Sequence, residues 1–450
     1  MTAGWTPEQI LKLAPDASSA SAGKGLAARS KWKSLGVNDV VVWGECQGSG
    51  KTPYQTEIYL EEPAYHCTCP SRKFPCKHAL GLFLLLADQP SAFARPADGP
   101  PGWVNEWLEK RAKRQEKAEE VAAAAPPKKA APNKAGQDKR ADQRQAKVTA
   151  GLEDLQVWLG DLMRGGLAAA KGQPYKFWDG IAARMVDAQA PGVARRLREM
   201  GGTAASNYRW QERLLEKLGQ LHLLLEGYRN LENLPGELQA EVRNQVGWTQ
   251  NQDELAQATG QFDRWLVLGQ TREEDDNRLK TQRTWLWGST SGRAAVVLDF
   301  AHGSQPLDTS LVPGSNLDAE LVYFPGSYPM RALVKPGARH NPSFEEWPGV
   351  AGCDDLLEGY SQALAENPWL EQFPLALGRV YPVRAGEEEW QIRDESGLCL
   401  PLDPGFTRGW QLLALSGGHP VGLFGLWDGH YFDPHGAWAE NRFIDLIENL

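Results

Sequence analysis

A cluster of three cysteines and one histidine within twelve residues constrains this chain more than any other feature of its sequence. The four residues follow the pattern C-x-C-x6-C-x-H and are Cys67, Cys69, Cys76 and His78. Three thiolates and one imidazole make the closed tetrahedral shell of a structural zinc site, which has no open position for a substrate. Ligands of this softness select Zn²⁺ over Mg²⁺, Ca²⁺ or Mn²⁺. We therefore predict that Zn²⁺ organises this segment.

The spacing of the four predicted ligands suits a single ion. Cys67 and Cys69 are two residues apart, so on an extended segment their side chains point to the same side. The last two ligands would come from the turn that enters a short helix over Ala79–Ala87, where exposed amide groups favour thiolate. His66 would point to the opposite side of the strand, as a surface residue or a hydrogen-bonding neighbour of a ligand.

These residues resemble the SWIM zinc finger of bacterial SWIM-finger proteins. The likeness runs from Trp43-Gly44 through Cys67–Leu80, covers about residues 30–90, and puts the four predicted ligands on the four ligand positions of the motif. It implies a ββα zinc module that binds DNA or proteins, as in some transposases and chromatin-remodelling ATPases. For the bacterial members it also implies AAA-type ATPase and von Willebrand A-domain proteins as partners.

Changes in composition divide the first 147 residues into two regions. Residues 1–90 hold a predicted hairpin, Val40–Trp43 with Thr56–Leu60, followed by the ligands and the short helix. Residues 91–147 begin with a charged helix, Trp103–Glu120, and continue as a linker rich in Ala, Pro and Lys. This linker has almost no large apolar residue, so we predict that it is disordered and that the zinc-finger module is tethered and need not be docked.

Two regions with different periodicities follow. Residues 148–270 repeat apolar residues at helical spacing, which predicts a helical bundle whose last helix spans Asp253–Leu268. Residues 271–450 contain short apolar runs bounded by Gly and Pro, which predict an acidic, mostly β, α+β domain. The fold class is therefore α+β and multidomain. The sequence leaves open whether these two regions share one core.

Particular elements are expected in the C-terminal region. The apolar runs predict strands at Ala294–Leu298, Glu320–Phe324 and Gln411–Leu415, and one helix at Asp354–Glu366. Its many tryptophans follow no fixed spacing, so we expect them to be core and interface residues. Cys46, Cys353 and Cys399 are expected to be packed in the core.

Charge is unevenly distributed along the chain, and its distribution helps to judge whether the partner is a nucleic acid or a protein. Residues 103–147 carry 12 Lys and Arg against 7 Asp and Glu, whereas residues 148–450 carry 26 against 41. The predicted zinc loop offers cations for phosphates and one ring for a base, and its candidate nucleic-acid-binding residues are Arg72, Lys73, Phe74 and Lys77. Residues 1–90, with 9 basic against 8 acidic, lack the basic excess of a dedicated DNA-binding domain. DNA and protein partners both stay open.

A phosphate-binding loop is excluded. Gly48-Ser49-Gly50-Lys51-Thr52 has the end of such a motif, but Glu45 stands where its first glycine is needed, and Pro53 follows where a helix should begin. We interpret this stretch as a hairpin turn.

A second cluster lies near the C-terminus, at residues 428–435. His430, Asp433 and His435 could bind a metal or exchange protons, although Asp-Gly and Asp-Pro pairs are typical of turns. We predict a zinc-binding interaction protein with no enzymatic activity and no catalytic residues. The alternative is an enzyme whose active site lies in the C-terminal region and whose zinc is only structural.

The sequence also predicts where the protein is found. Residues 1–6 have neither the basic nor the apolar stretch of a secretory signal, and the longest apolar run is far shorter than the roughly 20 residues that span a membrane. Six cysteines in 450 residues do not make a disulfide framework. We expect a cytoplasmic protein with no membrane segment.

Overall fold

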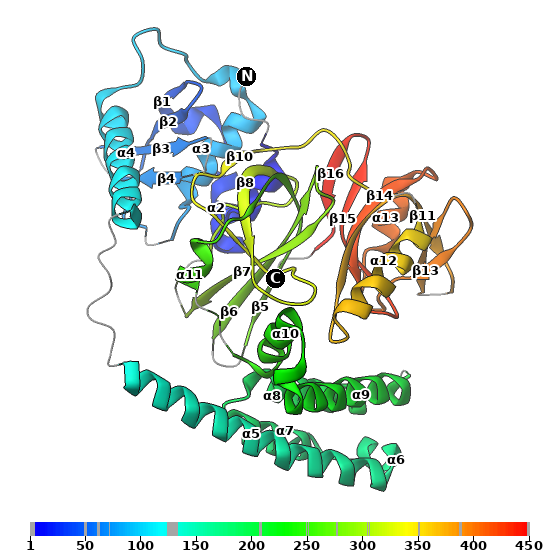
Figure 1. Cartoon of the computed structure of the whole chain (residues 1–450). Helices are drawn as coiled ribbons and strands as arrows, with labels where there is room; N and C mark the ends of the chain where they lie inside the picture. Colours follow the sequence, from blue (N-terminus) through cyan, green and yellow to red (C-terminus); the bar gives the residue numbers. More distant parts are fainter. Residues whose placement is uncertain are drawn as a thin grey trace.

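The computed structural model of the chain contains three antiparallel sheets and a helical bundle (Figure 1). It describes residues 5–48, 52–60, 64–71, 73–123, 134–206, 209–248, 250, 252–275, 278–303, 305, 307–349, 352–386 and 389–447. Within these residues, no helix is long and apolar enough to cross a membrane. The mixed α+β, multidomain class predicted from the sequence is confirmed.

The first sheet belongs to the N-terminal module. Its strands pair in the order β1-β2-β3-β4 and span Trp32–Val37, Val41–Cys46, Tyr54–Tyr59 and Ala64–Cys67. Helices α1 (Pro7–Lys12) and α2 (Ala17–Lys24) precede the sheet, and α3 (Lys77–Asp88) follows it. The predicted hairpin is confirmed as β2 and β3, and it forms the centre of a larger unit.

Both faces of this sheet are covered, because successive side chains of β2 point to opposite sides. Val42 belongs to a core shared with α3, whereas Val41 and Trp43 pack against Val104 of α4 (Gly102–Ala123). Helix α4 lies beside the sheet in Figure 1. The charged helix predicted here is therefore packed on the module through its apolar side.

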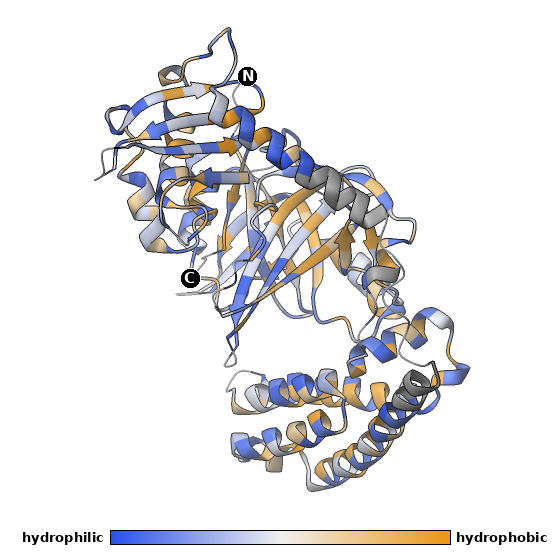
Figure 2. Ribbon diagram, turned by 90° about the vertical axis from the view of Figure 1, so that its left-hand side faces the viewer, coloured by the Kyte–Doolittle hydropathy of each residue, from blue (hydrophilic) through white to orange (hydrophobic). Residues whose placement is uncertain are grey.

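The helical bundle has its own core, as predicted, and lies below the sheets in Figures 1 and 2. Its helices are α5 (Lys134–Gly165), α6 (Leu167–Lys171), α7 (Tyr175–Asp187), α8 (Pro191–Ala205), α9 (Trp210–Arg229) and α10 (Gly236–Val246). Helix α5 includes residues 134–147, for which we predicted disorder. Ala, Lys, Arg and Gln are strong helix formers, and this segment continues into the buried face that begins at Val148. Residues 124–133 of the predicted linker lie outside the described residues.

The predicted last helix of the bundle is wrong. After the short α11 (Gln252–Ala256), residues 261–268 form the first part of strand β5 (Gln261–Glu274). Trp265 and Val267 enter one core, whereas Leu266 and Leu268 enter another. A strand buried on both faces is apolar at consecutive positions, so its period cannot be distinguished from that of a buried helix segment.

Two six-stranded antiparallel sheets make the C-terminal region, and apolar residues run along their central strands in Figure 2. The first has the order β10-β8-β5-β6-β7 with β9 on β8; besides β5, its strands are β6 (Leu279–Gly288), β7 (Ala294–His302), β8 (Asn316–Tyr323), β9 (Ala332–Val334) and β10 (Arg339–Asn341). The second has the order β13-β12-β11-β14-β15-β16, with strands β11 (Phe373–Arg384), β12 (Trp390–Asp394), β13 (Cys399–Pro401), β14 (Val421–Trp427), β15 (Phe432–Ala439) and β16 (Arg442–Asp445). A single core joins the two sheets.

Two elements of this region test the sequence predictions. The predicted helix is confirmed as α12 (Cys353–Glu366), but the strand predicted at Gln411–Leu415 is part of helix α13 (Gly409–Ser416). The buried positions of α13 are Gly409, Leu412 and Ser416, which is helical spacing. The run was too short for its period to be recognised.

Most of the residues that we predicted to lie in the core are buried or half-buried. Cys46 and Cys353 are buried as predicted, whereas Cys399 is exposed. Most of the tryptophans of the C-terminal region are buried or half-buried, but Trp410 is 61% exposed. Cys399 opens a three-residue edge strand, where one side of the chain has no neighbour to bury it.

The N-terminal module is docked on the C-terminal region, which the sequence prediction had left open. Gln9 donates a hydrogen bond to the carbonyl of Pro342 (2.9 Å), Lys12 pairs with Asp445, and Val312 enters the core of the module. The bundle is joined to the sheets in a similar way, because Trp369 belongs to the bundle core. The N-terminal module and the helical bundle therefore each contact the C-terminal region directly.

Candidate metal centre

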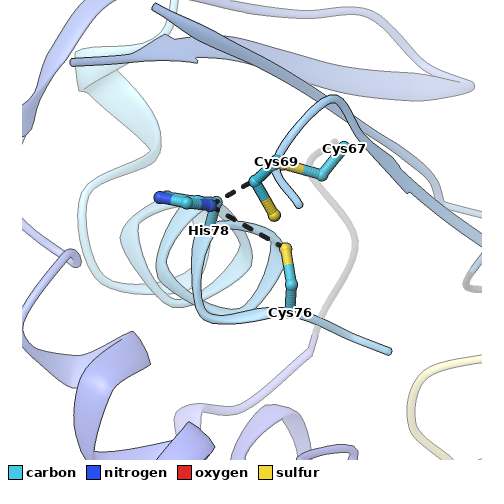
Figure 3. Close-up of side chains that lie close together, drawn as sticks. All are labelled: Cys67, Cys69, Cys76 and His78. Atoms are coloured by element: carbon cyan, nitrogen blue, oxygen red, sulfur yellow. Dashed lines mark hydrogen bonds between the residues drawn. The ribbon is translucent and has the colours of Figure 1, made fainter. Parts of the chain in front are cut away.

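The four predicted ligands converge at one point. Their candidate ligand atoms all lie within 4.8 Å of one another (Figure 3). The Nδ1 atom of His78 is 3.7 Å from Sγ of Cys67 and 4.0 Å from Sγ of Cys76. Tetrahedral Zn–S bonds of ~2.3 Å place ligand atoms about 3.8 Å apart, so the arrangement fits a zinc ion. Thiolates and an imidazole are also the donors that zinc prefers.

Three local structures bring these side chains together. Cys67 ends β4, Cys69 lies in the turn that follows, and Cys76 caps α3, with His78 in its first turn. Figure 3 shows the side chains of Cys76 and His78, at the start of α3, close to those of Cys67 and Cys69. As predicted, the ligands come from an extended segment and a helix N-terminus.

The site is largely shielded from water, which affects the protonation of its thiols. Cys67, Cys76 and His78 are buried, and Cys69 is half-buried. A hydrogen bond with the Cys67 thiol lowers the pKa of Cys76, whereas the same bond together with burial raises the pKa of Cys67. Burial also raises the pKa of Cys69. Because zinc binds cysteine as the thiolate, binding of the ion would release protons from these thiols.

His66 lies on the opposite side of its strand, as predicted. Its Nδ1 atom is 2.6 Å from Oε1 of the buried Glu57, and its ring stacks on Trp107 of α4 at 6.4 Å. Burial raises the pKa of Glu57 to about 7. The pair belongs to the contact between the sheet and α4, and not to the metal shell.

Comparison with known proteins places this site in a family. The family model of the SWIM zinc finger matches residues 54–87, and that of the SWIM-associated four-helix bundle domain matches residues 143–246. The chain contains a SWIM-type zinc finger. All four ligands lie inside the matched finger, and the second match ends with helix α10 of the bundle. No curated protein and no solved structure matches the chain.

The candidate nucleic-acid-binding residues of the SWIM finger differ in their surroundings. Lys73 forms an ion pair with Asp16 (2.6 Å), and this contact lowers the pKa of the Asp16 carboxyl. Phe74 is 46% exposed, and Lys77 is exposed at the start of α3. Arg72 lies outside the described residues. The charge of Lys73 is therefore already partly neutralised within the finger.

A cleft beside the finger was not predicted. It has a volume of about 650 Å³ and lies between the zinc-binding turn and α2, and two of the four metal ligands, Cys69 and His78, line it together with Ser19, Leu26, Tyr54 and Ser71. The ring of Tyr54 is 4.9 Å from that of His78. One wall comes from a helix some fifty residues before the ligands, so no local pattern pointed to it.

The C-terminal histidines serve other contacts. Oδ1 of Asp428 accepts hydrogen bonds from the amides of His430 and Tyr431, which confirms the predicted turn. His430 contacts Glu216 of α9 (3.1 Å), whereas the buried His435 contacts Asp433 (3.1 Å). Among the described residues, the only His, Cys, Asp and Glu side chains grouped closely enough to hold a metal are those of the finger.

Proposed function

We propose that this chain is a zinc-stabilised binding protein whose SWIM finger recognises another protein, and that it has no enzymatic activity of its own. The observation that carries the proposal is the closed set of four ligands next to an open cleft. A closed shell cannot accept a substrate, so the metal holds the fold while the surrounding surface binds.

The metal would supply much of the stability of this surface. It joins the end of β4, the turn and the start of α3, which are also the elements that form one wall of the cleft. Structural zinc contributes on the order of 10 kcal/mol to small modules of this kind. Loss of zinc would therefore remove the cleft as well as the site.

A protein partner suits the finger better than a nucleic acid. Phosphate binding requires available cations, but Lys73 is paired with Asp16. The exposed ring of Phe74 and the mixed polar and apolar cleft are features of protein interfaces. The acidic surplus of residues 148–450 would also repel phosphates.

The family resemblance suggests which partners to test. Bacterial SWIM-finger proteins are associated with AAA-type ATPases and von Willebrand A-domain proteins. We propose that this chain binds the same two classes of protein, in the cytoplasm. The enzyme alternative receives no support from the C-terminal histidines, because His430 and His435 make separate contacts on a turn and in a core.

A binding experiment with a matched pair of variants tests the proposal. The full-length protein would be titrated with the AAA-type ATPase and the A-domain protein of the same cell, and with labelled 20-mer DNA and RNA. Phe74→Glu should weaken protein binding at least tenfold, whereas Phe300→Glu should not, although the two rings are 46% and 49% exposed. Tight oligonucleotide binding that falls steeply with salt, without protein binding, would contradict the proposal.

A further inference from the structure

A groove of about 400 Å³ lies between α5 and α9 of the helical bundle, far along the chain from the finger. Its lining residues are mostly apolar or glycine: Leu159, Gly160, Met163, Leu215, Leu218 and Gly219, with Gln156 and His222. Leu159 and Leu218 are buried and form its floor. Met163 and Leu215 are 44% and 49% exposed and form its walls.

The groove is open because two glycines leave room in it. A Cβ atom added to Gly219 would meet no atom within 4 Å, and one added to Gly160 would meet only the end of the Arg164 side chain. Glycine inside a helix is less favourable than alanine, so its presence on both helices requires another reason. Space for side chains from outside the bundle is such a reason.

The apolar surface extends beyond the groove. Val157 on α5 and Leu223 on α9 are 66% and 46% exposed. Figure 1 shows α5 along the lower edge of the molecule, with the sheets on the other side of the bundle. Exposed apolar residues that gather on one face, rather than singly, mark an interaction surface.

The spacing of these residues suits a helix. On α9 the apolar and glycine positions 215, 219 and 223 recur every four residues, and on α5 the lining residues Gln156, Gly160 and Met163 have nearly the same spacing. Two such ridges leave a channel into which the side chains of a third helix pack. From Leu215 to His222, the α9 residues that line it, the channel is ~10 Å long at 1.5 Å per residue, which is about two helical turns.

The charges around the groove indicate the character of that helix. On the segments of α5 and α9 that line the groove, and just before α9, acidic residues outnumber basic ones: Glu153, Asp154, Asp161, Glu212, Glu216 and Glu226 against Arg164, Arg209, Arg213, Lys217 and Arg229. Ion pairs join Arg164 to Asp161, Arg209 to Glu212 and Arg229 to Glu226, and Glu216 contacts His430. The whole region from residue 148 onward is acidic, with 26 basic against 41 acidic residues. A cationic ligand would be favoured here.

We propose that this groove binds an amphipathic helix of a partner protein, with apolar residues at positions i, i+4 and i+7 that enter the groove and Lys or Arg on its flanks. This is a second binding surface, and it does not depend on the role proposed for the finger. The recognition is of the kind in which an apolar helix face lies in a groove and flanking charges set the partner.

A pair of glycine variants tests the proposal. The probe is a fluorescein-labelled 18-residue helical peptide with leucines at i, i+4 and i+7 and lysines on both flanks, titrated against the full-length protein and followed by anisotropy. Gly219→Leu fills the groove and should weaken binding at least tenfold. Gly202→Leu is the control, because a Cβ atom at Gly202, exposed on α8, also meets no atom within 4 Å. Both variants should keep the thermal midpoint of the wild type.

Three results would overturn the proposal. The first is equal binding of the lysine-flanked peptide by the wild type and Gly219→Leu. The second is equal or tighter binding of a peptide with the same leucines and glutamate flanks. The third is a wild-type dimer in light scattering that Gly219→Leu converts to a monomer, since the occupant would then be a second copy of the chain.

Discussion

Lys12, the last residue of the first helix, forms an ion pair with Asp445 in the last strand. The contact joins the two ends of the described chain and holds α1 against β16. Asp445 also accepts a hydrogen bond from the amide of Ile447 (2.8 Å). Trp5, just before α1, packs on Phe83 of α3 with ring centroids 5.6 Å apart, so this pair connects the helix that begins at the metal site to the C-terminal sheet.

Removing the carboxylate of this pair should lower the free energy of unfolding more than removing both charges. Asp445→Asn leaves the ammonium group of Lys12 near Arg408 and Arg272, without the carboxylate that offsets them. We expect a loss of about 2–3 kcal/mol in urea unfolding, below the range for fully buried pairs because the Lys12 side chain is 26% exposed. The double variant Lys12→Met with Asp445→Leu should recover most of this loss. If Asp445→Asn unfolds like the wild type, the pair does not hold the module in place.

Substitution of a zinc ligand should unfold the N-terminal module alone. Cys76→Ala removes a thiolate from the closed shell, and the zinc content of the full-length protein should fall from one per chain to none by mass spectrometry. The bundle has its own core, so its helical signal should survive in circular dichroism. Cys399→Ala, at an exposed cysteine, should keep its zinc. Retention of zinc by Cys76→Ala would place the metal elsewhere.

The metal ligands were predictable because their spacing is local. Cys67 and His78 are eleven residues apart, and a turn and a helix N-terminus fix their geometry with little help from the rest of the chain. The helices of the bundle were predictable for a similar reason, because Leu214, Leu218, Leu221 and Leu225 repeat at the period of one buried face.

Other features depend on contacts between residues far apart in the sequence. Strand β5 has an ambiguous period because both of its faces are buried by strands that come later in the chain. The cleft beside the finger needs α2, and the docking of the module needs Asp445 opposite Lys12. No pattern of neighbouring residues records such pairings, so they become visible only in three dimensions.

Trp369 should hold the bundle to the C-terminal sheets. Its side chain is 3% exposed within the bundle core, and its Nε1 atom donates a hydrogen bond to the carbonyl of Gln220 (2.9 Å). Trp369→Ala leaves a cavity and should cost about 3–5 kcal/mol in urea unfolding. Trp410→Ala, at a tryptophan that is 61% exposed, should cost less than about 1 kcal/mol. Similar losses in the two variants would show that Trp369 does not anchor the bundle.

Asp263 should make the first C-terminal sheet sensitive to acid. Its carboxylate is 4% exposed and accepts hydrogen bonds from the amides of Arg264, Thr290 and Ser291. Burial alone would raise its pKa, but the hydrogen bonds from Ser291 and the other amides outweigh this effect and lower the pKa below 3.8. The group therefore stabilises the fold above the pKa that it has when unfolded, and the contribution is lost as the pH falls further.

A variant separates this effect from general acid unfolding. Asp263→Asn keeps the size of the side chain but loses charge-assisted hydrogen bonds, and should lower the free energy of unfolding by about 1–3 kcal/mol at pH 7. The difference from the wild type should shrink as the pH is lowered from 5 toward 3, because the wild-type carboxyl then binds a proton on unfolding. Asp39→Asn, whose side chain is 84% exposed, should match the wild type at each pH. The free energies of unfolding of Asp263→Asn and the wild type could instead differ by the same amount at every pH. The three amides would then not stabilise the ionised form of the Asp263 carboxyl.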